Sequence, residues 1–178
     1  MKYLIMCEGS NELAVINILL QNDLLTIKED DLLGLKAFHA RQINSNSAVK
    51  LELNIYPGND VCVLRIGDTL TEKLTITEDY ANKIINTEKY CTKPELEVLL
   101  IIAENLWGEY EKKKSSVKPK VFAKTEIVFN GKRYNNSTKF YEQYFENRED
   151  LLVDSIKQYK HLKKHDKEEL YLADLLKE

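Results

Sequence analysis

Cysteine is scarce in this chain, and its spacing forms no recognisable pattern. Cys7, Cys62 and Cys91 are the only three cysteines among 178 residues, and no two of them make a Cys-x-x-Cys pair. This spacing suits neither a disulfide framework nor a zinc site. Cys7 and Cys62 fall in apolar, strand-like runs, where the thiol is expected to pack as a small buried hydrophobe.

Long apolar runs are also missing. No stretch approaches the roughly 20 apolar residues that are needed to span a bilayer. Glu8 interrupts the apolar run at the N-terminus too early for a secretory signal. We therefore expect no membrane partner and a location in the reducing cytoplasm. The phosphate-binding Walker motif is absent as well, so any use of ATP must come from another chain.

The composition that is present is that of an ordinary globular protein. Hydrophobic residues make up 43% of the chain and charged residues 31%, which suggests one soluble domain. The net charge of −3 argues against a protein coated in positive charge. It leaves room for a local basic groove, because nucleic acid responds to local potential more than to total charge.

Hydrophobic periodicity predicts alternating strands and helices in the first part of the chain. Two Thr-x-x-Glu patterns, Thr75 with Glu78 and Thr92 with Glu95, resemble capping boxes at helix starts. The predicted elements are strands at 2–6, 51–55 and 61–67, helices at 11–21, 75–88 and 92–114, a loop or small hairpin at 115–137, and a helical tail from 138 onward.

These elements predict an α/β fold in which a small parallel sheet is flanked by helices. The sheet and its helices are expected within residues 1–108. Residues 109–178 are expected to form a loop and a C-terminal helical extension, packed on the first part as a single globular unit.

Three carboxylates stand out by their positions. Glu8 follows the first predicted strand and Asp68 follows the strand at 61–67, and ligand sites of open α/β sheets gather at the carboxyl ends of strands. Either acid could instead belong to a solvated turn. Glu97 is the one charge in the apolar run "LEVLLII", so its burial requires a basic partner such as Arg41 or Arg65, a raised pKa, or a metal ion.

Three motifs resemble those of Toprim domains, with the closest pattern in the RloB-like and OLD-type nucleases of bacterial defence systems. "YLIMCEGSNE" is similar to their first motif, in which a strand ends in Glu-Gly and an acid, here Glu12, follows three residues later. "VCVLRIGDTL" partly matches the second motif, Asp-x-Asp, through Asp68, with Leu70 in place of the second acid. "TKPELEVLL" looks like their Asn-Pro-x-x-Glu motif and places Glu97 at the acidic position.

The resemblance covers roughly residues 1–106 and implies a Toprim-like fold. It implies that Mg²⁺ or Mn²⁺ is held by Glu8, Asp68 and Glu97, with Glu72 as a further candidate ligand near the missing acid. It also implies cleavage of DNA or RNA by a nuclease or nuclease subunit that works beside a separate ATPase. Leu70 favours the alternative, a catalytically degenerate module that binds a phosphate-bearing ligand or a partner protein.

The chemistry of phosphodiester cleavage accounts for such residues. Hard oxygen ligands hold Mg²⁺ or Mn²⁺, which stabilises negative charge and activates water. Gly9 permits close approach of the backbone, and the helix that begins near Ser10 offers free amides to an anion. Further candidates for phosphate or nucleic-acid contact are Arg41, Lys73, Lys112, Lys113 and Lys114. The last three could equally be a solvated helix end, and association into a homo-oligomer is left open.

Overall fold

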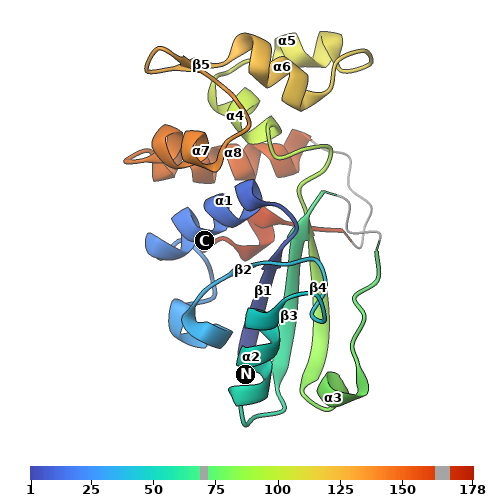
Figure 1. Cartoon of the computed structure of the whole chain (residues 1–178). Coiled ribbons are helices and arrows are strands. Elements are labelled where there is room, and N and C mark those ends of the chain that lie inside the picture. Colours follow the sequence, from blue (N-terminus) through green and yellow to red (C-terminus); the bar gives the residue numbers. More distant parts are fainter. Residues whose placement is uncertain (69–71, 163–168) are drawn as a thin grey trace.

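The computed structural model describes residues 1–68, 72–162 and 169–178. Its main sheet has five parallel strands in the order β2-β1-β3-β4-β7 (Figure 1). The predicted α/β class, with a parallel sheet flanked by helices, is therefore confirmed. The strands are β1 (Lys2–Cys7), β2 (Phe38–His39), β3 (Val61–Gly67), β4 (Ile84–Cys91) and β7 (Leu170–Tyr171).

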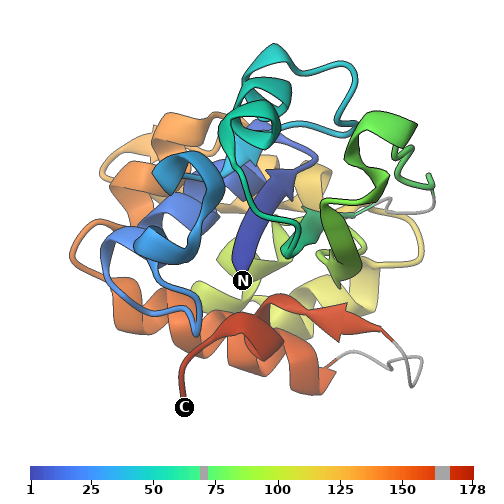
Figure 2. The same ribbon diagram turned by 90° about the horizontal axis from the view of Figure 1, so that it is seen from below.

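The two faces of the sheet belong to different apolar clusters, because successive side chains of a strand point to opposite faces. Leu4 and Val63 pack in one cluster with residues of α2 (Ser47–Ile55). Ile5 and Leu64 pack in the other cluster with residues of α1 (Ser10–Gln21). Figure 2 looks along the strands and shows α2 on one side of the sheet and the C-terminal segment on the other.

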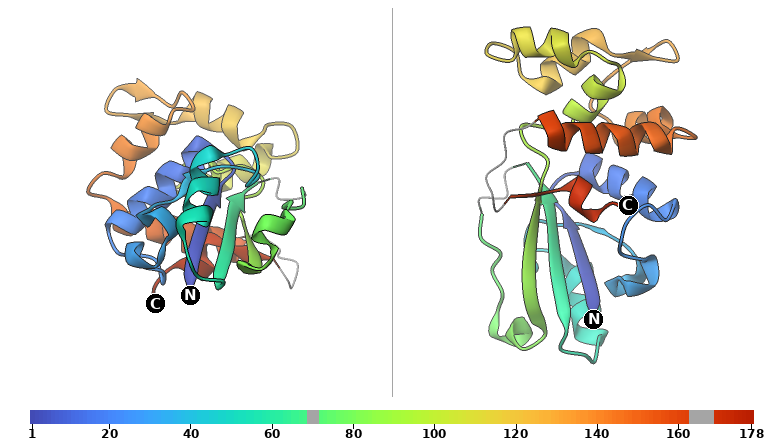
Figure 3. Two further views of the ribbon diagram at one scale, coloured as in Figure 1. Left: turned by 60° about the horizontal axis from the view of Figure 1, so that its bottom comes forward. Right: turned by 180° about the vertical axis from the view of Figure 1, so that it is seen from behind.

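The remaining large helices stack beyond the carboxyl ends of the strands (Figures 1 and 3). Helix α4 packs against α8, and α7 packs against α1. Residues of these helices share one apolar cluster with Ile66 of β3, so the helical layer covers the edge of the sheet where ligand sites usually lie. The other helices are α3 (Glu78–Ala81), α4 (Val98–Ala103), α5 (Trp107–Lys113), α6 (Pro119–Glu126), α7 (Thr138–Phe145) and α8 (Glu149–Leu162), with 3₁₀ turns at Glu29–Asp31, Leu33–Leu35 and Leu172–Leu175.

The sequence predicts a helical tail from residue 138 onward, but the C-terminal part also contains a strand. Strand β7 pairs with β4 and extends the main sheet at its edge. The hairpin expected within 115–137 is present as β5 (Val128–Phe129) and β6 (Lys132–Arg133), but helix α6 precedes it.

Two predicted elements are wrong. The stretch predicted as a strand at 51–55 belongs to helix α2: Leu51 and Ile55 are exposed, whereas Val49 and Leu53, four residues apart, are buried. The alternation of Leu and Ile there imitates a strand, although the buried face has helical spacing. The helix predicted at 75–88 is only the single turn α3, and β4 begins at Ile84.

The long helix predicted at 92–114 is divided into α4 and α5. Asn105, between them, has a φ of 57°, a left-handed conformation that ends a helix. Neither capping box is formed, because α3 begins after Thr77 and α4 begins after Glu97. Thr92 instead lies buried just past β4.

The burial of the cysteines and the lengths of the helices agree with what the sequence predicts. Cys7, Cys62 and Cys91 are all buried, as small hydrophobes are. Among the described residues, no helix combines the length and the apolar character that crossing a bilayer requires.

Candidate functional site

Glu8 and Asp68 lie at the same edge of the sheet, as the sequence predicted. Strands β1 and β3 are parallel neighbours, with Cys7 opposite Ile66. The backbone N–H of Glu8 donates to the carbonyl of Ile66 at 2.8 Å, so the β1–β3 ladder fixes the start of the turn. Asp68 directly follows β3.

These two acids line one pocket of about 240 Å³ between the sheet edge and the helical layer. The first turn of α1 contributes one wall, the segment before α4 contributes another, and α6 and the loop before α7 complete it. The lining residues are Glu8, Gly9, Ser10, Asn11, Glu12, Arg41, Asp68, Glu95, Leu96, Glu97, Lys120 and Asn136. Glu8, Asp68 and Glu97, three acids from distant parts of the sequence, therefore reach the same pocket.

Two glycines allow the acids to pack against bare backbone. A Cβ atom on Gly67 would lie 2.6 Å from the Cβ of Glu8 and 2.3 Å from its Oε2. A Cβ atom on Gly9 would lie 2.4 Å from Oε2 of Glu12. The group that lies against Gly9 in the structure is therefore the Glu12 carboxylate, and the approach of a metal ion or phosphate to this backbone stays a prediction.

Glu12, in the first turn of α1, is the strongest electrostatic feature of the pocket. The pKa of this carboxyl is raised to about 7, mainly by burial; the nearby charges of Asp68, Glu97 and Glu8 contribute to the rise, and a backbone hydrogen bond opposes it. Such crowding of like charges in a partly desolvated site favours a bound cation or a retained proton. In the sequence, Glu12 stands out only as the acid of the first Toprim-like motif, and it is not among the predicted site residues.

Glu97 is the most buried acid of the pocket, with a side chain only 3% exposed. The hydroxyl of Tyr134 donates to its Oε1 at 2.7 Å, and Nζ of Lys120 lies 3.9 Å from the same oxygen. Burial raises its pKa, and the bond from Tyr134 opposes that shift. The partners proposed from sequence, Arg41 and Arg65, are not the ones observed.

The two arginines have other contacts. Arg41 lines the pocket, and its Nη2 lies 3.4 Å from Oε1 of Glu8. Arg65 is buried in β3, and its Nη1 donates to the backbone carbonyl of Glu72 at 2.5 Å. Only Arg41 is therefore available at the mouth of the pocket.

The donor chemistry of the pocket fits a hard divalent cation, since its carboxylates are the ligands that Mg²⁺ and Mn²⁺ prefer. Asn11 adds a buried side-chain oxygen, Oδ1, that has no hydrogen-bond partner among the described residues. The arrangement is not a ready-made cage, however. Within residues 1–68, 72–162 and 169–178, no three His, Cys, Asp or Glu side chains form a group that could hold a metal ion as they stand.

Two predicted site residues lie outside the pocket. Glu72 and Lys73 are exposed and do not line it, so their predicted roles as metal ligand and phosphate contact receive no support. The reason is local: Arg65 binds the carbonyl of Glu72, and the amide of Gln42 donates to the carbonyl of Lys73 at 2.9 Å, which holds this segment by its backbone. Leu70, which replaces the second acid of the motif, lies outside the described residues.

The three lysines at the end of α5 do not line the pocket either. Nζ of Lys113 lies 3.7 Å from Glu126, and Nζ of Lys114 lies 3.0 Å from Glu111. Lys112 is exposed. Lys120 and Asn136 do reach the pocket. Both come from the stretch predicted as a loop or small hairpin, where the run of lysines indicates Lys120 as a phosphate contact and nothing in the sequence indicates Asn136.

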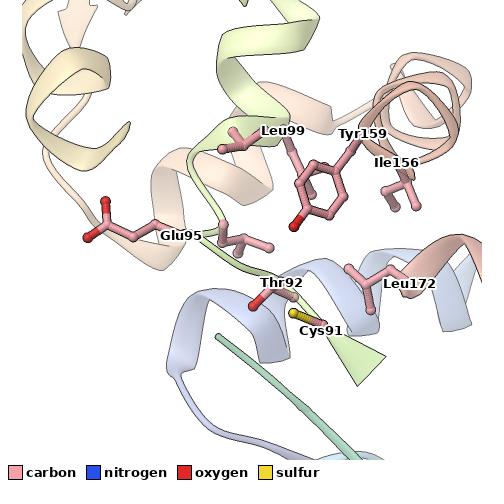
Figure 4. A pocket seen from close by; sticks show the side chains of 9 residues that line it. Cys91, Thr92, Glu95, Leu99, Ile156, Tyr159 and Leu172 are labelled. Atoms are coloured by element: carbon pink, nitrogen blue, oxygen red, sulfur yellow. The ribbon is translucent and has the colours of Figure 1, made fainter. Parts of the chain in front are cut away.

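A second cavity lies on the other side of the segment that leads into α4, and it is too small for a substrate. Its volume of about 10 Å³ is room for about one water molecule, and its walls are mostly apolar. Figure 4 shows Tyr159 extending from α8 towards Cys91 and Thr92, while Glu95 points away. The Glu95 carboxylate instead accepts the backbone N–H of Lys120 at 2.8 Å.

Two buried tyrosines with different partners allow the site's contribution to stability to be measured. Tyr134→Phe is expected to lower the free energy of unfolding by about 2–3 kcal/mol, because it removes a buried hydrogen bond to a carboxylate. Tyr159→Phe is the matched control: its hydroxyl is buried without a partner among the described residues, so the expected change is within about 0.5 kcal/mol of zero. Urea unfolding of both variants measures the difference. Equal losses of unfolding free energy in the two variants would contradict the stabilisation expected from the hydrogen bond between Tyr134 and Glu97.

Comparison of the chain with protein-family models, with curated proteins and with solved structures gives no match.

Proposed function

We propose that this chain is a Toprim-type nuclease, or the nuclease subunit of a bacterial defence system, that uses Mg²⁺ or Mn²⁺ to cleave phosphodiesters of DNA or RNA. One observation carries the proposal: Glu8, Glu12, Asp68 and Glu97 line a single pocket at the carboxyl edge of a parallel sheet. Their order along the chain is that of the Toprim-like motifs. Three of them, Glu8, Asp68 and Glu97, which the sequence singles out separately, thus lie where such sheets bind ligands.

Glu8 and Asp68 are the residues best placed to hold the cation, because they follow neighbouring strands. Glu12 and Glu97 would complete its surroundings. When bound, a divalent cation stabilises charge on phosphate oxygens and lowers the pKa of a bound water. It would also favour the ionised form of Glu12, whose pKa is raised mainly by burial and further by the neighbouring acids.

Positive groups at the same pocket would bind the substrate. Arg41 lies beside Glu8, and Lys120 lies beside Glu97. A cation held by these acids would replace the two side chains as counter-charges and free them for the oxygens of a phosphate group. The backbone amides of Ser10 and Asn11, at the start of the twelve-residue helix α1, would add donors for the same anion.

The test is a cleavage assay with metal as the variable. Supercoiled plasmid, linear duplex DNA and RNA are incubated with the protein in Mg²⁺, in Mn²⁺ and in excess chelator. We expect nicking or cleavage in at least one divalent metal and none in chelator. Cleavage that persists in chelator, or that no longer co-purifies with the protein, would contradict the proposal.

A second function is favoured by the same side chains in a different role. Arg41 and Lys120 already neutralise part of the acidic pocket, and no described group of three ligands is ready for a metal. A module that binds a phosphate-bearing ligand without cleaving it needs only the positive groups. Calorimetric titration with Mn²⁺ distinguishes the two functions, because the nuclease requires binding of the metal and the module does not.

A further inference from the structure

Positive charge is concentrated in one continuous segment of the chain. Residues 112–139, which we call the basic lobe, contain nine lysines and arginines and one acid, Glu126, for a net charge of +8. The rest of the chain carries −11, which gives the overall −3. The basic residues of the lobe are Lys112, Lys113, Lys114, Lys118, Lys120, Lys124, Lys132, Arg133 and Lys139.

Most of this charge is not neutralised within the molecule. Only Lys113, Lys114 and Lys120 of the basic lobe make ion pairs with described residues. The other five lysines of the lobe are exposed. A large single-sign surface on a protein of opposite net charge raises the local concentration of a polyanion.

The basic lobe borders the acidic pocket. Lys120 and Asn136, both in the lobe, line that pocket. Lys124 lies one helical turn further along α6, about 6 Å from Lys120 along the axis, and four residues apart means the same helix face. Arg133 donates to the backbone carbonyls of Lys124 and Thr125, so positive groups continue from the pocket across α6 towards the hairpin, at the end of the molecule farthest from the sheet (Figure 3).

The aromatic side chains indicate which polyanion fits. All sixteen Tyr, Phe and Trp residues lie in the described part of the chain, and none of them is exposed. Recognition of single strands relies on exposed aromatic rings that stack on bases, whereas duplexes are held mainly through their phosphates. Within the described residues, the basic lobe offers contacts to phosphates and no exposed aromatic ring on which a base could stack.

We propose that the basic lobe binds the phosphate backbone of double-stranded nucleic acid, without base stacking, and presents it to the acidic pocket. The inference deepens the proposed function, on which it rests for the part the pocket plays. The binding itself needs no metal, because lysine contacts to phosphate require none.

The experiment measures binding in excess chelator by fluorescence anisotropy, with labelled duplex DNA, duplex RNA and the corresponding single strand as probes. The test variant replaces Lys118, Lys124 and Lys132 by Gln. The matched control replaces three exposed lysines outside the lobe, Lys28, Lys89 and Lys157, by Gln. Circular dichroism verifies that both variants are folded.

We expect the wild type to bind a duplex more tightly than the single strand, with a Kd that rises steeply with salt. Each lost phosphate contact lowers the slope of log K against log salt by about 1, so the lobe variant should lose about 2–3 units of slope and at least about tenfold in affinity, whereas the control should change little. The duplex that is bound more tightly identifies DNA or RNA as the substrate class.

Equal losses in the two variants would overturn the inference, since total charge would then explain the binding, and so would tighter binding of the single strand. Duplex binding in chelator without any metal-dependent cleavage would remove the proposed nuclease and leave the lobe assignment intact. Metal-dependent cleavage that is unaffected by the lobe variant would remove the lobe assignment and leave the proposed nuclease intact.

Discussion

Glu8→Gln is expected to weaken Mn²⁺ binding by more than about 100-fold and to reduce metal-dependent cleavage by a similar factor. Residues that only support metal ligands already cost 10–100-fold when they are changed, and Glu8 is placed to be a ligand. The substitution keeps the shape of a side chain that packs directly on Gly67, so the fold should be retained. It removes one negative charge from a pocket whose affinity for a cation depends on such charges.

The measurements are Mn²⁺ titration by calorimetry and initial rates of cleavage at saturating metal. Asp68→Asn should behave like Glu8→Gln, because the two acids follow adjacent strands at the same edge. Glu109→Gln, an exposed acid of α5, is the control and should change neither quantity. An unaltered Kd for Mn²⁺ in Glu8→Gln would leave Glu8 as a surface acid paired with Arg41 and would favour the module that binds phosphate without cleavage.

The two acids that the sequence placed correctly at the sheet edge, Glu8 and Asp68, each directly follow a buried strand. β1 and β3 are buried along most of their lengths, so their positions and the acids just after them follow from hydrophobicity alone. Because both strands are parallel, the meeting of Glu8 with Asp68 at one edge was also predictable. Glu97 was found for a related reason, as a charge inside an apolar run.

What the sequence did not reveal depends on contacts between distant segments. The partners of Glu97 are Tyr134 and Lys120. Helices α4 and α5 separate Glu97 from Lys120 in the sequence, and α6 and the β5–β6 hairpin follow before Tyr134, so the approach of both partners depends on how α6 packs. Helix α2 and strand β4 were interpreted wrongly because short half-exposed elements have weak periodicity, and tertiary packing decides them. Glu72 and Lys73 were selected by closeness to Asp68 in sequence, although the backbone holds them outside the pocket.

Without a divalent cation, the protein is expected to lose stability as the pH rises from about 4.5 to about 7. The pKa of Glu12 is raised to about 7 in the folded protein, mainly by burial, from an ordinary value of 4.5. The folded state therefore holds this proton more tightly than the unfolded chain does. The stabilisation is complete below pH 4.5 and is lost as the pH approaches 7, by up to about 3 kcal/mol.

Glu12→Gln isolates this contribution, because a neutral amide has no proton to lose. The free energy of unfolding of the wild type minus that of the variant, obtained by urea titration in chelator at a series of pH values, should fall across this range. Glu142→Gln, an exposed acid of α7, is the control and should show no such slope. A pH-independent difference for Glu12→Gln would mean that Glu12 is ionised without penalty and that the pocket is not short of positive charge.

Mn²⁺ should cancel most of this dependence, because a metal binds the deprotonated carboxylates and so gains affinity as the pH rises. At about 100 times its Kd, the ion adds about 2.7 kcal/mol to the free energy of unfolding, which is enough to offset most of the cost of ionising Glu12. Glu12→Gln should then gain less from Mn²⁺ than the wild type, although it is more stable in chelator at pH 7. Loss of stability in the empty site together with gain in the filled one is the behaviour expected of acids gathered to bind a cation, whereas acids that serve only the fold would show neither.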